Sequence, residues 1–488
     1  MSTARAITET HANFINGKWV APQSGEYYAR TNPARPLESL GNFPSSAERD
    51  VDLAIEAAET AASAWADTPG PQRGALLFRF AQLLEASKTE LAKIITREQG
   101  KALCESTGEV GRAAVEARYM AGEASRICGQ SFPSERPGFS AYTVLEPLGV
   151  VAAICPWNFP VVTPVRKIAP ALAFGNTVVF KPASLTPWSA VFVTRLLEEA
   201  GVPPGVVNLV MGPGARVGSV LVADRRVRGI SFTGSTDVGV PLYEAAARHL
   251  ASVQLELGGK NPAIVIDYAD LDEAAREIVS AAFLCSGQRC TALSRVIVTE
   301  EQADALVAKI LSYVKKIQVG DGMLETTTMG PLVNRSQFDT VERYVAKGVE
   351  SGCKLLYGGK ALGRQPDQDG YYFSPTLFDQ VPASSALAKE EIFGPVLPVI
   401  RVRDVDEAIS VANGTRYGLA ASVFTSRFDV ASRCMRRIQA GMIHVNHGTA
   451  SQAHVPFGGR KDSGQGAFSI GPTAKDFFTN VKTIYGKW

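Results

Sequence analysis

The sequence predicts an α/β fold built around an open, doubly wound parallel sheet. Short apolar runs bounded by Gly or Pro occur at residues 149–154, 176–180, 206–211 and 229–233, and such runs are typical of strands buried on both faces. Helix-length segments separate the runs, the clearest being residues 190–200. This β-α-β-α-β alternation is the pattern of nucleotide-binding sheets.

Helices are predicted before this sheet, and a second alternating block is predicted after it. Residues 51–65 are rich in alanine, and residues 73–97 form a second helical stretch. Beyond Glu256 the alternation resumes, with apolar runs at 263–266 and 295–298 followed by another helical pattern. We therefore expect a domain boundary close to Glu256.

Length, composition and charge restrict the class of protein. A chain of 488 residues exceeds one ordinary core, so two or three domains are expected. Hydrophobic residues make up 45% and charged residues 20%, as in globular proteins. The formal charge of +2 is too small to indicate binding to nucleic acid or to an anionic membrane. No apolar run approaches the roughly 18 residues of a membrane span, and residues 1–6 lack the apolar stretch of a secretion signal.

Cysteine usage indicates the compartment. The seven cysteines form no Cys-x-x-Cys pair and no metal-ligand spacing with the five histidines, so no metal site is expected. An odd number of cysteines without a disulfide framework suits free thiols in a reducing compartment. We therefore expect a cytoplasmic protein.

Three polar residues in separate segments indicate covalent chemistry on a carbonyl group. Cys290 ends the run Gly287-Gln288-Arg289-Cys290, and no histidine stands near it in sequence to activate the thiol. The candidate base is instead the carboxylate of Glu256, and the Asn158 side-chain amide is a donor of the oxyanion-hole type.

These residues can oxidise an aldehyde without a histidine. The Cys290 thiolate adds to the carbonyl, and the Asn158 side chain and the backbone N–H of Cys290 stabilise the oxyanion. Loss of a hydride to a nicotinamide leaves a thioester. Glu256 then activates the water that hydrolyses this thioester.

Two segments at the ends of predicted strands are candidates for binding the nucleotide. Residues 212–218 read Gly-x-Gly-x-x-x-Gly, one residue away from the usual dinucleotide fingerprint. Lys181 follows the apolar run 176–180, and the carboxyl end of a parallel strand is where ligands bind in such sheets.

The motifs along the chain resemble the signature set of the NAD(P)-dependent aldehyde dehydrogenase family, in the family's order. They are Pro156-Trp157-Asn158-Phe159-Pro160, Phe232-Thr233-Gly234-Ser235, Glu256-Leu257-Gly258-Gly259-Lys260, Gly287-Gln288-x-Cys290, Glu391-Ile392-Phe393-Gly394-Pro395 and Pro456-Phe457-Gly458-Gly459. The resemblance extends from about residue 14 to the C-terminus.

The resemblance implies a three-part, aldehyde-dehydrogenase-like architecture. Residues 1–127 and 147–256 would form a Rossmann-like cofactor domain, and residues 257–455 an α/β catalytic domain. Residues 128–146 and the C-terminal tail, 456–488, would form a small β oligomerisation element. Such enzymes are usually homodimers or homotetramers, so one of these assemblies is expected.

Matching positions also imply the catalytic roles derived above and a set of cofactor-binding residues. Lys181 would contact the adenosine ribose, and Glu391 with Phe393 the nicotinamide ribose. The other cofactor-binding candidates are Trp157, Ser184, Gly214, Phe232, Gly234 and Ser235.

Ser184 bears on the choice of cofactor. Many NAD-preferring members have a glutamate just after Lys-Pro-Ala, which would bond the ribose hydroxyls and repel a 2′-phosphate. Ser184 is neutral and short and can donate a hydrogen bond, so we expect NADP to be accepted, with NAD as the other cofactor. The alternative is that the serine only loosens discrimination.

Arg166 bears on the substrate. Many relatives that act on neutral aldehydes have tryptophan here, whereas members similar to succinate-semialdehyde dehydrogenase have an arginine that holds the substrate's distal carboxylate. Those members also have an arginine where this chain has Leu284, so another side chain would have to replace that contact. The substrate-binding candidates are therefore Arg166, Arg289, Gln452, His454 and Phe457. The alternative is a surface-facing Arg166.

The predicted reaction is the oxidation of an ω-oxo carboxylic acid to a dicarboxylate. The resemblance includes dehydrogenases of succinic and of α-ketoglutaric semialdehyde, which both have an aldehyde and a carboxylate at opposite ends. The alternatives are a broad-specificity enzyme for neutral aldehydes and, from a different class, a non-catalytic binding protein on the same fold. A CoA-acylating enzyme is disfavoured because it would leave Glu256 without a task.

Overall fold

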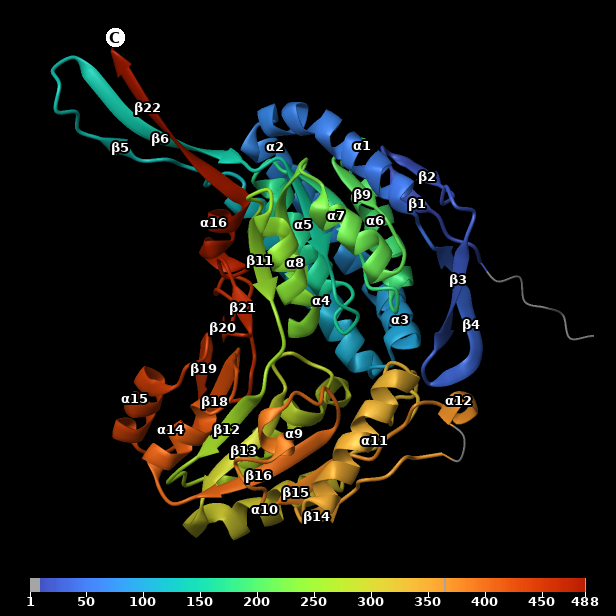
Figure 1. The fold of residues 1–488 in the computed structure, drawn as a ribbon, viewed down its shortest axis with the longest axis vertical. Helices are drawn as coiled ribbons and strands as arrows, with labels where there is room; N and C mark the ends of the chain where they lie inside the picture. The colour runs from blue at the N-terminus through green and yellow to red at the C-terminus, as the bar shows by residue number, and fades with distance from the viewer. Residues whose placement is uncertain (1–8, 364–365, 488) are drawn as a thin grey trace, which may run out of the picture.

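Two sheets with their covering helices make up the molecule, one above the other in Figure 1. The computed structural model describes residues 9–363 and 366–487. Residues 1–6, on which the expectation about a secretion signal depends, lie outside the described residues. Helices alternate with mostly parallel strands, which confirms the predicted α/β fold class.

The first sheet has the strand order β2-β1-β9-β8-β7-β10-β11-β21. Its five central strands run parallel, and β1, β2 and β21 pair antiparallel at the edges. The strands are β1 (Asn13–Ile15), β2 (Lys18–Val20), β7 (Val150–Ile154), β8 (Thr177–Lys181), β9 (Val207–Leu209), β10 (Val227–Thr233), β11 (Ser252–Glu256) and β21 (Gly464–Gln465). The four apolar runs of the sequence are therefore neighbouring strands of one sheet.

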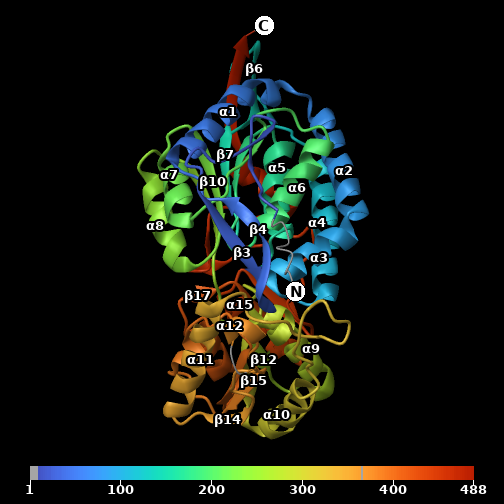
Figure 2. The ribbon, with the colours of Figure 1, turned by 90° about the vertical axis from the view of Figure 1, so that its right-hand side faces the viewer.

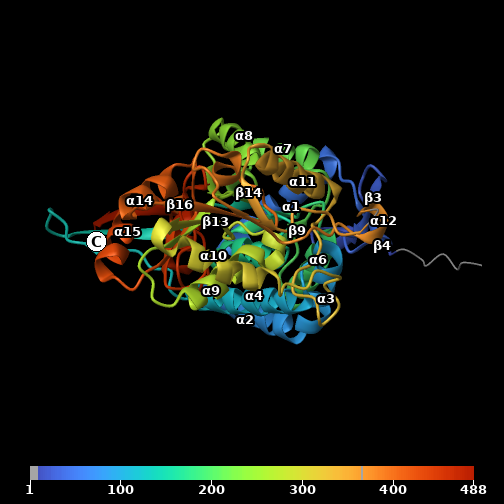
Figure 3. The ribbon, with the colours of Figure 1, turned by 90° about the horizontal axis from the view of Figure 1, so that it is seen from below.

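Helices cover both faces of this sheet, because alternate residues of a buried strand face opposite layers. Val151 and Ala153 of β7 pack in one core, and Val150, Ala152 and Ile154 pack in the other. The first core contains α2 (Gly70–Ala86), α3 (Lys88–Gln99), α4 (Leu103–Glu123), α5 (Val162–Ala173) and α6 (Pro187–Glu199). The second contains α1 (Glu48–Asp67), α7 (Ser219–Ala223) and α8 (Thr236–Ala247). Figure 3 shows α7 and α8 on the opposite side of the molecule from α2 and α4.

The helical stretch predicted at residues 73–97 consists of two helices, α2 and α3. Ser87 stands between them with φ −89° and ψ 6°, a conformation that ends α2. The predicted stretch is helical but divided at Ser87, because apolar periodicity reports a buried face and not unbroken backbone hydrogen bonding.

The second sheet has the order β14-β15-β16-β13-β12-β18-β19 and is parallel except for the pair β14–β15. Its strands are β12 (Asn261–Val265), β13 (Leu293–Thr299), β14 (Lys354–Tyr357), β15 (Thr376–Asp379), β16 (Val396–Val402), β18 (Ala420–Phe424) and β19 (Met442–Val445). Helices α9 (Leu271–Phe283) and α10 (Glu300–Val314) cover one face. The other face is covered by α11 (Arg335–Glu350), α13 (Ala386–Lys389), α14 (Val405–Asn413) and α15 (Phe428–Arg437).

A three-stranded arm projects from the body near the first sheet (Figures 1 and 2). It consists of β5 (Ser131–Phe132), β6 (Phe139–Pro147) and β22 (Thr479–Lys487), and β22 pairs with β6 along its whole length. The remaining strands are the hairpin β3 (Tyr27–Asn32) and β4 (Arg35–Pro44), and the pair β17 (Tyr417–Gly418) and β20 (Arg460–Lys461). The expected domain limits stay a prediction. In the described ranges, no helix is long and apolar enough to cross a membrane.

Candidate active site

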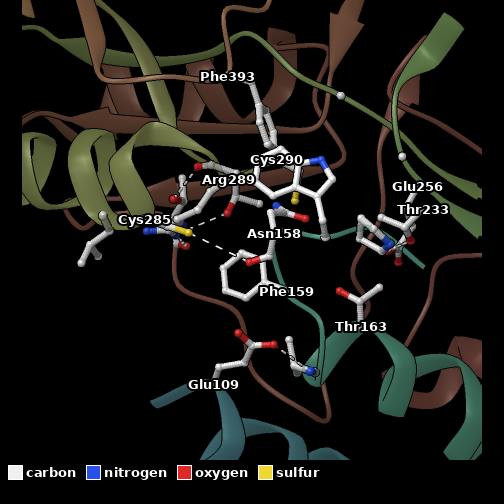
Figure 4. Close-up of a pocket in the computed structure, with 18 of the residues that line it drawn as sticks. Glu109, Asn158, Phe159, Thr163, Thr233, Glu256, Cys285, Arg289, Cys290 and Phe393 are labelled. Atoms are coloured by element: carbon white, nitrogen blue, oxygen red, sulfur yellow. Dashed lines mark hydrogen bonds between the residues drawn. The ribbon is translucent and has the colours of Figure 1, made fainter. Parts of the chain in front are cut away.

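A cavity of about 730 Å³ is lined by the ends of β10 and β11 in the first sheet and by loop and helix segments that flank the second sheet. Asn158 follows β7, Glu256 ends β11, and Cys290 follows the turn after α9, and all three line the cavity. Figure 4 shows their side chains around it, on separate segments of the chain. The cavity therefore lies at the carboxyl edge of the first sheet, where ligands bind in parallel α/β sheets.

The turn before Cys290 has an unusual backbone. Cys285 and Ser286 are both left-handed, each with φ +56°, and Gly287 follows with φ +70°. A Cβ on Gly287 would lie 2.3 Å from the backbone oxygen of Gly394, so only glycine fits here. Non-glycine residues in the left-handed region cost about 1–2 kcal/mol each, and such conformations persist only where the surroundings enforce them.

Polar contacts enforce this turn. The Gln288 side chain is fully buried, donates to the backbone oxygen of Cys285 (3.2 Å) and accepts from the backbone N–H of Val333 (3.0 Å). The Ser286 hydroxyl donates to the backbone oxygen of Gly330 (2.7 Å). Gly287 and Gln288 therefore fix the conformation of the loop that carries the nucleophile.

Cys290 is a thiol in this environment. Burial raises its pKa to about 11, with a further contribution from the Glu256 carboxylate, while Arg166 and Arg289 act in the opposite direction. A thiolate therefore needs a change in this environment, which the binding of a cation or the removal of a negative charge supplies.

Asn158 is buried beside Cys290, and its Nδ2 donates one hydrogen bond to the backbone oxygen of Gln288 (3.0 Å). The other N–H of this amide is the candidate oxyanion donor. Two residues that the sequence did not indicate hold Asn158 in place: the Lys101 Nζ donates to the backbone oxygen of Asn158 (2.6 Å) and pairs with Glu109 (2.8 Å). Neither residue belongs to a motif, so no sequence signal could have identified them.

Glu256 is buried at the end of β11, and both of its carboxylate oxygens have partners. The Thr233 hydroxyl donates to Oε2 (3.1 Å), and the Ser469 hydroxyl donates to Oε1. Ser469 comes from the C-terminal segment, so the position of the candidate base depends on two distant parts of the chain.

Lys181 ends β8 and Ser184 follows it, next to the glycine cluster. Lys181 is buried, and its Nζ donates to the backbone oxygen of Pro182 (2.9 Å), which leaves two N–H groups for a ligand. Burial lowers its pKa to about 8. The Ser184 hydroxyl donates to the backbone oxygen of Gly212 (2.8 Å), so this proton is already in use. Gly214 is exposed, and a Cβ there would meet no atom within 4 Å.

The other cofactor-binding candidates line the cavity, with one exception. Gly234, Ser235, Trp157, Glu391 and Phe393 line it, and the rings of Trp157 and Phe393 meet edge to face with centroids 5.5 Å apart. Phe232 instead packs in the core of the first sheet against Gly234.

Glu391 is the residue that the sequence predicts to bind the nicotinamide ribose. Its Oε1 accepts from the backbone N–H of Gly259 (2.9 Å), and burial raises its pKa to about 7. Helix α8 begins at Thr236, directly after the cavity-lining Ser235, and a helix N-terminus binds phosphate. A nicotinamide dinucleotide fits the groups found here, which are the buried Lys181, the N-terminus of α8, the rings of Trp157 and Phe393, and the Glu391 carboxylate.

Arg166 lies on α5 and lines the cavity, so the alternative of a surface-facing Arg166 is wrong. Its side chain is 8% exposed and forms a two-pronged ion pair with Glu116, through Nε (3.2 Å) and Nη2 (2.8 Å). Its guanidinium also lies 4.6 Å from the ring centre of Phe457.

The remaining substrate-binding candidates divide into two groups. Arg289 and Phe457 line the cavity, as does Leu284, which stands at the position of the missing arginine. Gln452 and His454 are exposed residues outside its lining. Arg112 on α4 lines the cavity as well, although the sequence analysis did not single it out. Among the described residues, no cluster of His, Cys, Asp or Glu is suited to a metal ion.

Comparison with known proteins identifies the family. The profile of the aldehyde dehydrogenase family matches residues 19–484. The chain belongs to the aldehyde dehydrogenase family. It is therefore an NAD(P)-dependent enzyme that oxidises an aldehyde to a carboxylic acid, as the sequence motifs predicted.

Relatives with different substrates are similar to this enzyme at nearly equal identity. The α-ketoglutaric semialdehyde dehydrogenase of Bacillus subtilis is 43% identical, over 99% of both chains. The retinaldehyde dehydrogenase 3 of Homo sapiens is 40% identical, over 96% of this chain and 92% of its own. Overall identity therefore does not separate an acidic from a neutral substrate.

Solved structures confirm the fold and include both cofactor classes. An NAD-dependent aldehyde dehydrogenase from Sinorhizobium meliloti has a TM-score of 0.96 at 37% identity, over 99% of this chain and 95% of that one. An E. coli NADP-dependent enzyme has a TM-score of 0.95 at 36% identity, over 98% of each chain. The fold by itself does not decide between NAD and NADP.

Proposed function

We propose that this enzyme oxidises an ω-oxo carboxylate, α-ketoglutaric or succinic semialdehyde, to the dicarboxylate. The observation that carries the proposal is the presence of three arginines in the cavity wall, Arg112, Arg166 and Arg289. A guanidinium matches the planar fork of a carboxylate. Arg112 and Arg166 pair with the same carboxylate, Glu116, so one acidic side chain is shared by two of these cations.

The names of similar proteins give this proposal partial support. Dehydrogenases of α-ketoglutaric semialdehyde are among the relatives, and so is a retinaldehyde dehydrogenase. Because identity is nearly equal for both, the charged wall is the stronger argument. The apolar Leu284, Phe159 and Phe457 on the same cavity are what favours the alternative, a neutral aldehyde.

In the proposed mechanism, the Cys290 thiolate forms a bond to the aldehyde carbon, and the carbonyl oxygen becomes an oxyanion. The free N–H of the Asn158 amide and the backbone N–H of Cys290 donate to this oxyanion. The bound nicotinamide cofactor supplies the acceptor for the hydride that leaves the former aldehyde carbon. The product of that loss is a thioester on Cys290.

Glu256 is proposed to complete the cycle. It takes a proton from the attacking water, whose oxygen bonds to the thioester carbon, and the C–S bond breaks to release the acid and the thiolate. Its present contacts with Thr233 and Ser469 hold the carboxylate ready at the cavity wall.

We also propose that NADP is accepted along with NAD. Lys181, with two unused N–H groups, would hold the adenosine ribose or its phosphate. Ser184 is neutral and therefore does not repel a 2′-phosphate. Its hydroxyl does not donate to the cofactor, because it already donates to the backbone oxygen of Gly212. We further propose that the enzyme assembles through the β5-β6-β22 arm, as a dimer or a tetramer. A cytoplasmic location is proposed as well, and the seven free thiols support it.

The test is a comparison of kcat/KM across aldehydes with each cofactor. The enzyme is assayed with α-ketoglutaric semialdehyde, succinic semialdehyde, propanal and benzaldehyde. The proposal expects the two acidic aldehydes to exceed the neutral pair by at least about tenfold, the equivalent of about 1.4 kcal/mol. Higher kcat/KM for the neutral aldehydes would establish the alternative.

A further inference from the structure

Lys101 is a buried residue beside the oxyanion donor, and the proposed mechanism gives it no task. We propose that Lys101 is a positioning residue. Through its ion pair with Glu109 it fixes the backbone of Asn158, so that the side-chain amide of Asn158 is held beside Cys290. This inference rests on the proposed function, because it names the residue on which the oxyanion donor depends.

The ammonium group of Lys101 is fully occupied by the protein. Its Nζ donates to the Glu109 carboxylate (2.8 Å) and to the backbone oxygen of Asn158 (2.6 Å). It also lies 4.0 Å from the ring centre of Phe159, a cation–π contact. An ammonium has three N–H donors, and these three contacts account for them. The side chain is 1% exposed, so Lys101 acts on the Asn158 backbone and not on a bound substrate.

Glu109 binds the same loop at a second point. Its Oε2 pairs with Lys101, and its Oε1 accepts from the backbone N–H groups of Val161 (2.8 Å) and Val162 (3.1 Å). Helix α5 begins at Val162, and the first N–H groups of a helix have no partner within the helix. One buried ion pair therefore holds the loop both at Asn158 and where α5 begins.

The same stretch of chain also contacts the turn before the nucleophile. The Glu105 carboxylate accepts from the backbone N–H of Cys285 (2.7 Å), and the Gln99 Nε2 donates to the Cys285 sulfur (3.6 Å). This sulfur lies 4.0 Å from the backbone oxygen of Asn158 (Figure 4). Residues 99–109 therefore hold both the oxyanion donor and the turn before the nucleophile, two groups that must act on one carbonyl.

The direction of the free Asn158 N–H depends on this backbone. The amide already donates its other N–H to the backbone oxygen of Gln288 (3.0 Å). An oxyanion donor acts at about 3 Å from the developing charge, and a misplacement of about 1 Å can cost about 100-fold in rate. Without Lys101, the peptide after Asn158 loses a charge-assisted hydrogen bond, and the side chain it carries is no longer held in this direction.

A buried ion pair can also serve stability alone. That role predicts a lower free energy of unfolding and a normal rate in the folded enzyme, whereas a positioning role predicts a slower chemical step at unchanged KM. The pair of Arg401 on β16 with Asp379 on β15 provides the comparison. Asp379 is 3% exposed, its Oδ2 accepts from Arg401 Nη2 (2.7 Å), and neither residue lines the cavity.

Lys101→Met tests the inference, with Arg401→Met as its matched control. Stopped-flow absorbance measures cofactor reduction in the first turnover, with the best of the four aldehydes named above at saturation. We expect Lys101→Met to lower this rate about 10- to 100-fold and to keep KM within about threefold. Arg401→Met should lower stability in urea and keep the rate within about threefold. An unchanged rate in Lys101→Met, or equal losses in both variants, would overturn the inference.

Asn158→Ala shows whether Lys101 acts through Asn158. This variant lacks the side-chain donor, and its first-turnover rate should fall about 100- to 1,000-fold. Lys101 then has no oxyanion donor to position. The double variant Lys101→Met/Asn158→Ala should therefore be within about threefold of Asn158→Ala alone. If the two losses multiply, Lys101 acts independently of Asn158 and the inference is wrong.

Glu109→Gln carries the test if Lys101→Met does not fold. It keeps the size of the side chain and an oxygen for a backbone N–H, but it removes the charge that holds the ammonium. We expect a first turnover about 3- to 10-fold slower, and no further loss when Asn158→Ala is added. A wild-type rate in Glu109→Gln, or losses that multiply, would count against the inference.

Failure of this inference and failure of the proposed function give different results. If Asn158→Ala keeps the wild-type rate, the proposed mechanism fails, and the inference fails with it. If Asn158→Ala is slow and Lys101→Met is not, only the role of Lys101 fails. The preference for acidic over neutral aldehydes in the wild type tests the substrate class separately.

Discussion

The nucleophile and the wall that faces it are built in different ways. The turn before Cys290 is held by Ser286, Gly287 and Gln288, all within four residues of the thiol. The facing wall joins Arg112 on α4 to Arg166 on α5 through Glu116, and reaches Ser451, 339 residues beyond Arg112. The residues that shape the turn therefore stand in one short motif, although their partners Gly330, Val333 and Gly394 are distant in sequence, whereas the facing wall is assembled from residues of separate helices and loops.

The two cavity cysteines provide the sharpest test of the nucleophile side. Cys290→Ala should abolish turnover, with a loss of at least about 10⁴-fold in kcat, because no other group can form the thioester. Cys285→Ala should keep kcat within about tenfold. Cys285 is 2% exposed, and its sulfur is engaged with Gln99 (3.6 Å) and with the backbone oxygen of Asn158 (4.0 Å). Steady-state rates with propanal measure both, and a reversed order would exchange the roles of the cysteines.

Glu256→Gln should separate acylation from hydrolysis. We expect a burst of reduced cofactor followed by a kcat about 10²- to 10⁴-fold lower, because the amide cannot take a proton from water. Stopped-flow absorbance of the cofactor measures the burst, and rapid steady turnover would remove Glu256 as the base.

The same variant has a predicted pH signature. The Glu256 carboxylate raises the pKa of Cys290, which is about 11 in the wild type. Removing this negative charge stabilises the thiolate, so the pKa of Cys290 should fall. The pH dependence of iodoacetamide labelling, followed on the Cys290 peptide by mass spectrometry, should shift to lower pH; an unchanged profile would mean that the two groups do not interact.

On the facing wall, Arg166→Met should destabilise the protein. It leaves Glu116 buried with one cation in place of two, and breaking a buried ion pair costs about 3–5 kcal/mol. Because Arg112 still pairs with Glu116 (2.8 Å), we expect the lower limit, about 3 kcal/mol, in urea unfolding. The double variant Arg166→Met/Glu116→Gln should recover part of this loss. A single variant as stable as the wild type would show that the pair contributes nothing.

The smallest expected effect concerns the cofactor. Ser184→Glu should shift the ratio of kcat/KM for NADP and NAD about tenfold or more toward NAD, because a carboxylate repels a 2′-phosphate. Ser184→Ala removes the hydrogen bond to Gly212 without adding charge and should leave the ratio unchanged. Equal shifts in both variants would mean that loop geometry, and not charge, selects the cofactor.

Much of the fold and of the reaction centre was predictable from the sequence. The buried strands of the first sheet could be recognised in the sequence as apolar runs, since residues on both of their faces pack in a core. Cys290, Glu256 and Asn158 stood in recognisable motifs, and the fold brings them to one cavity. The break at Ser87 was not predictable, because the apolar pattern continues across it.

The substrate wall shows where sequence reasoning ends. Arg166 was visible as an unusual residue, but nothing in the sequence indicated that Glu116, 50 residues earlier, binds it. Gln452 and His454 were plausible replacements for a missing contact, yet both are exposed outside the cavity lining. Arg112 also lines the cavity, although it belongs to no motif.

By itself, the sequence determined the α/β class, the family and the reaction, because the residues that carry the chemistry stand in short motifs. Only the tertiary structure decided which arginines line the cavity and which carboxylate they pair with. Pairing between charged side chains depends on distances across helices such as α4 and α5, and those distances exist only after the chain has folded.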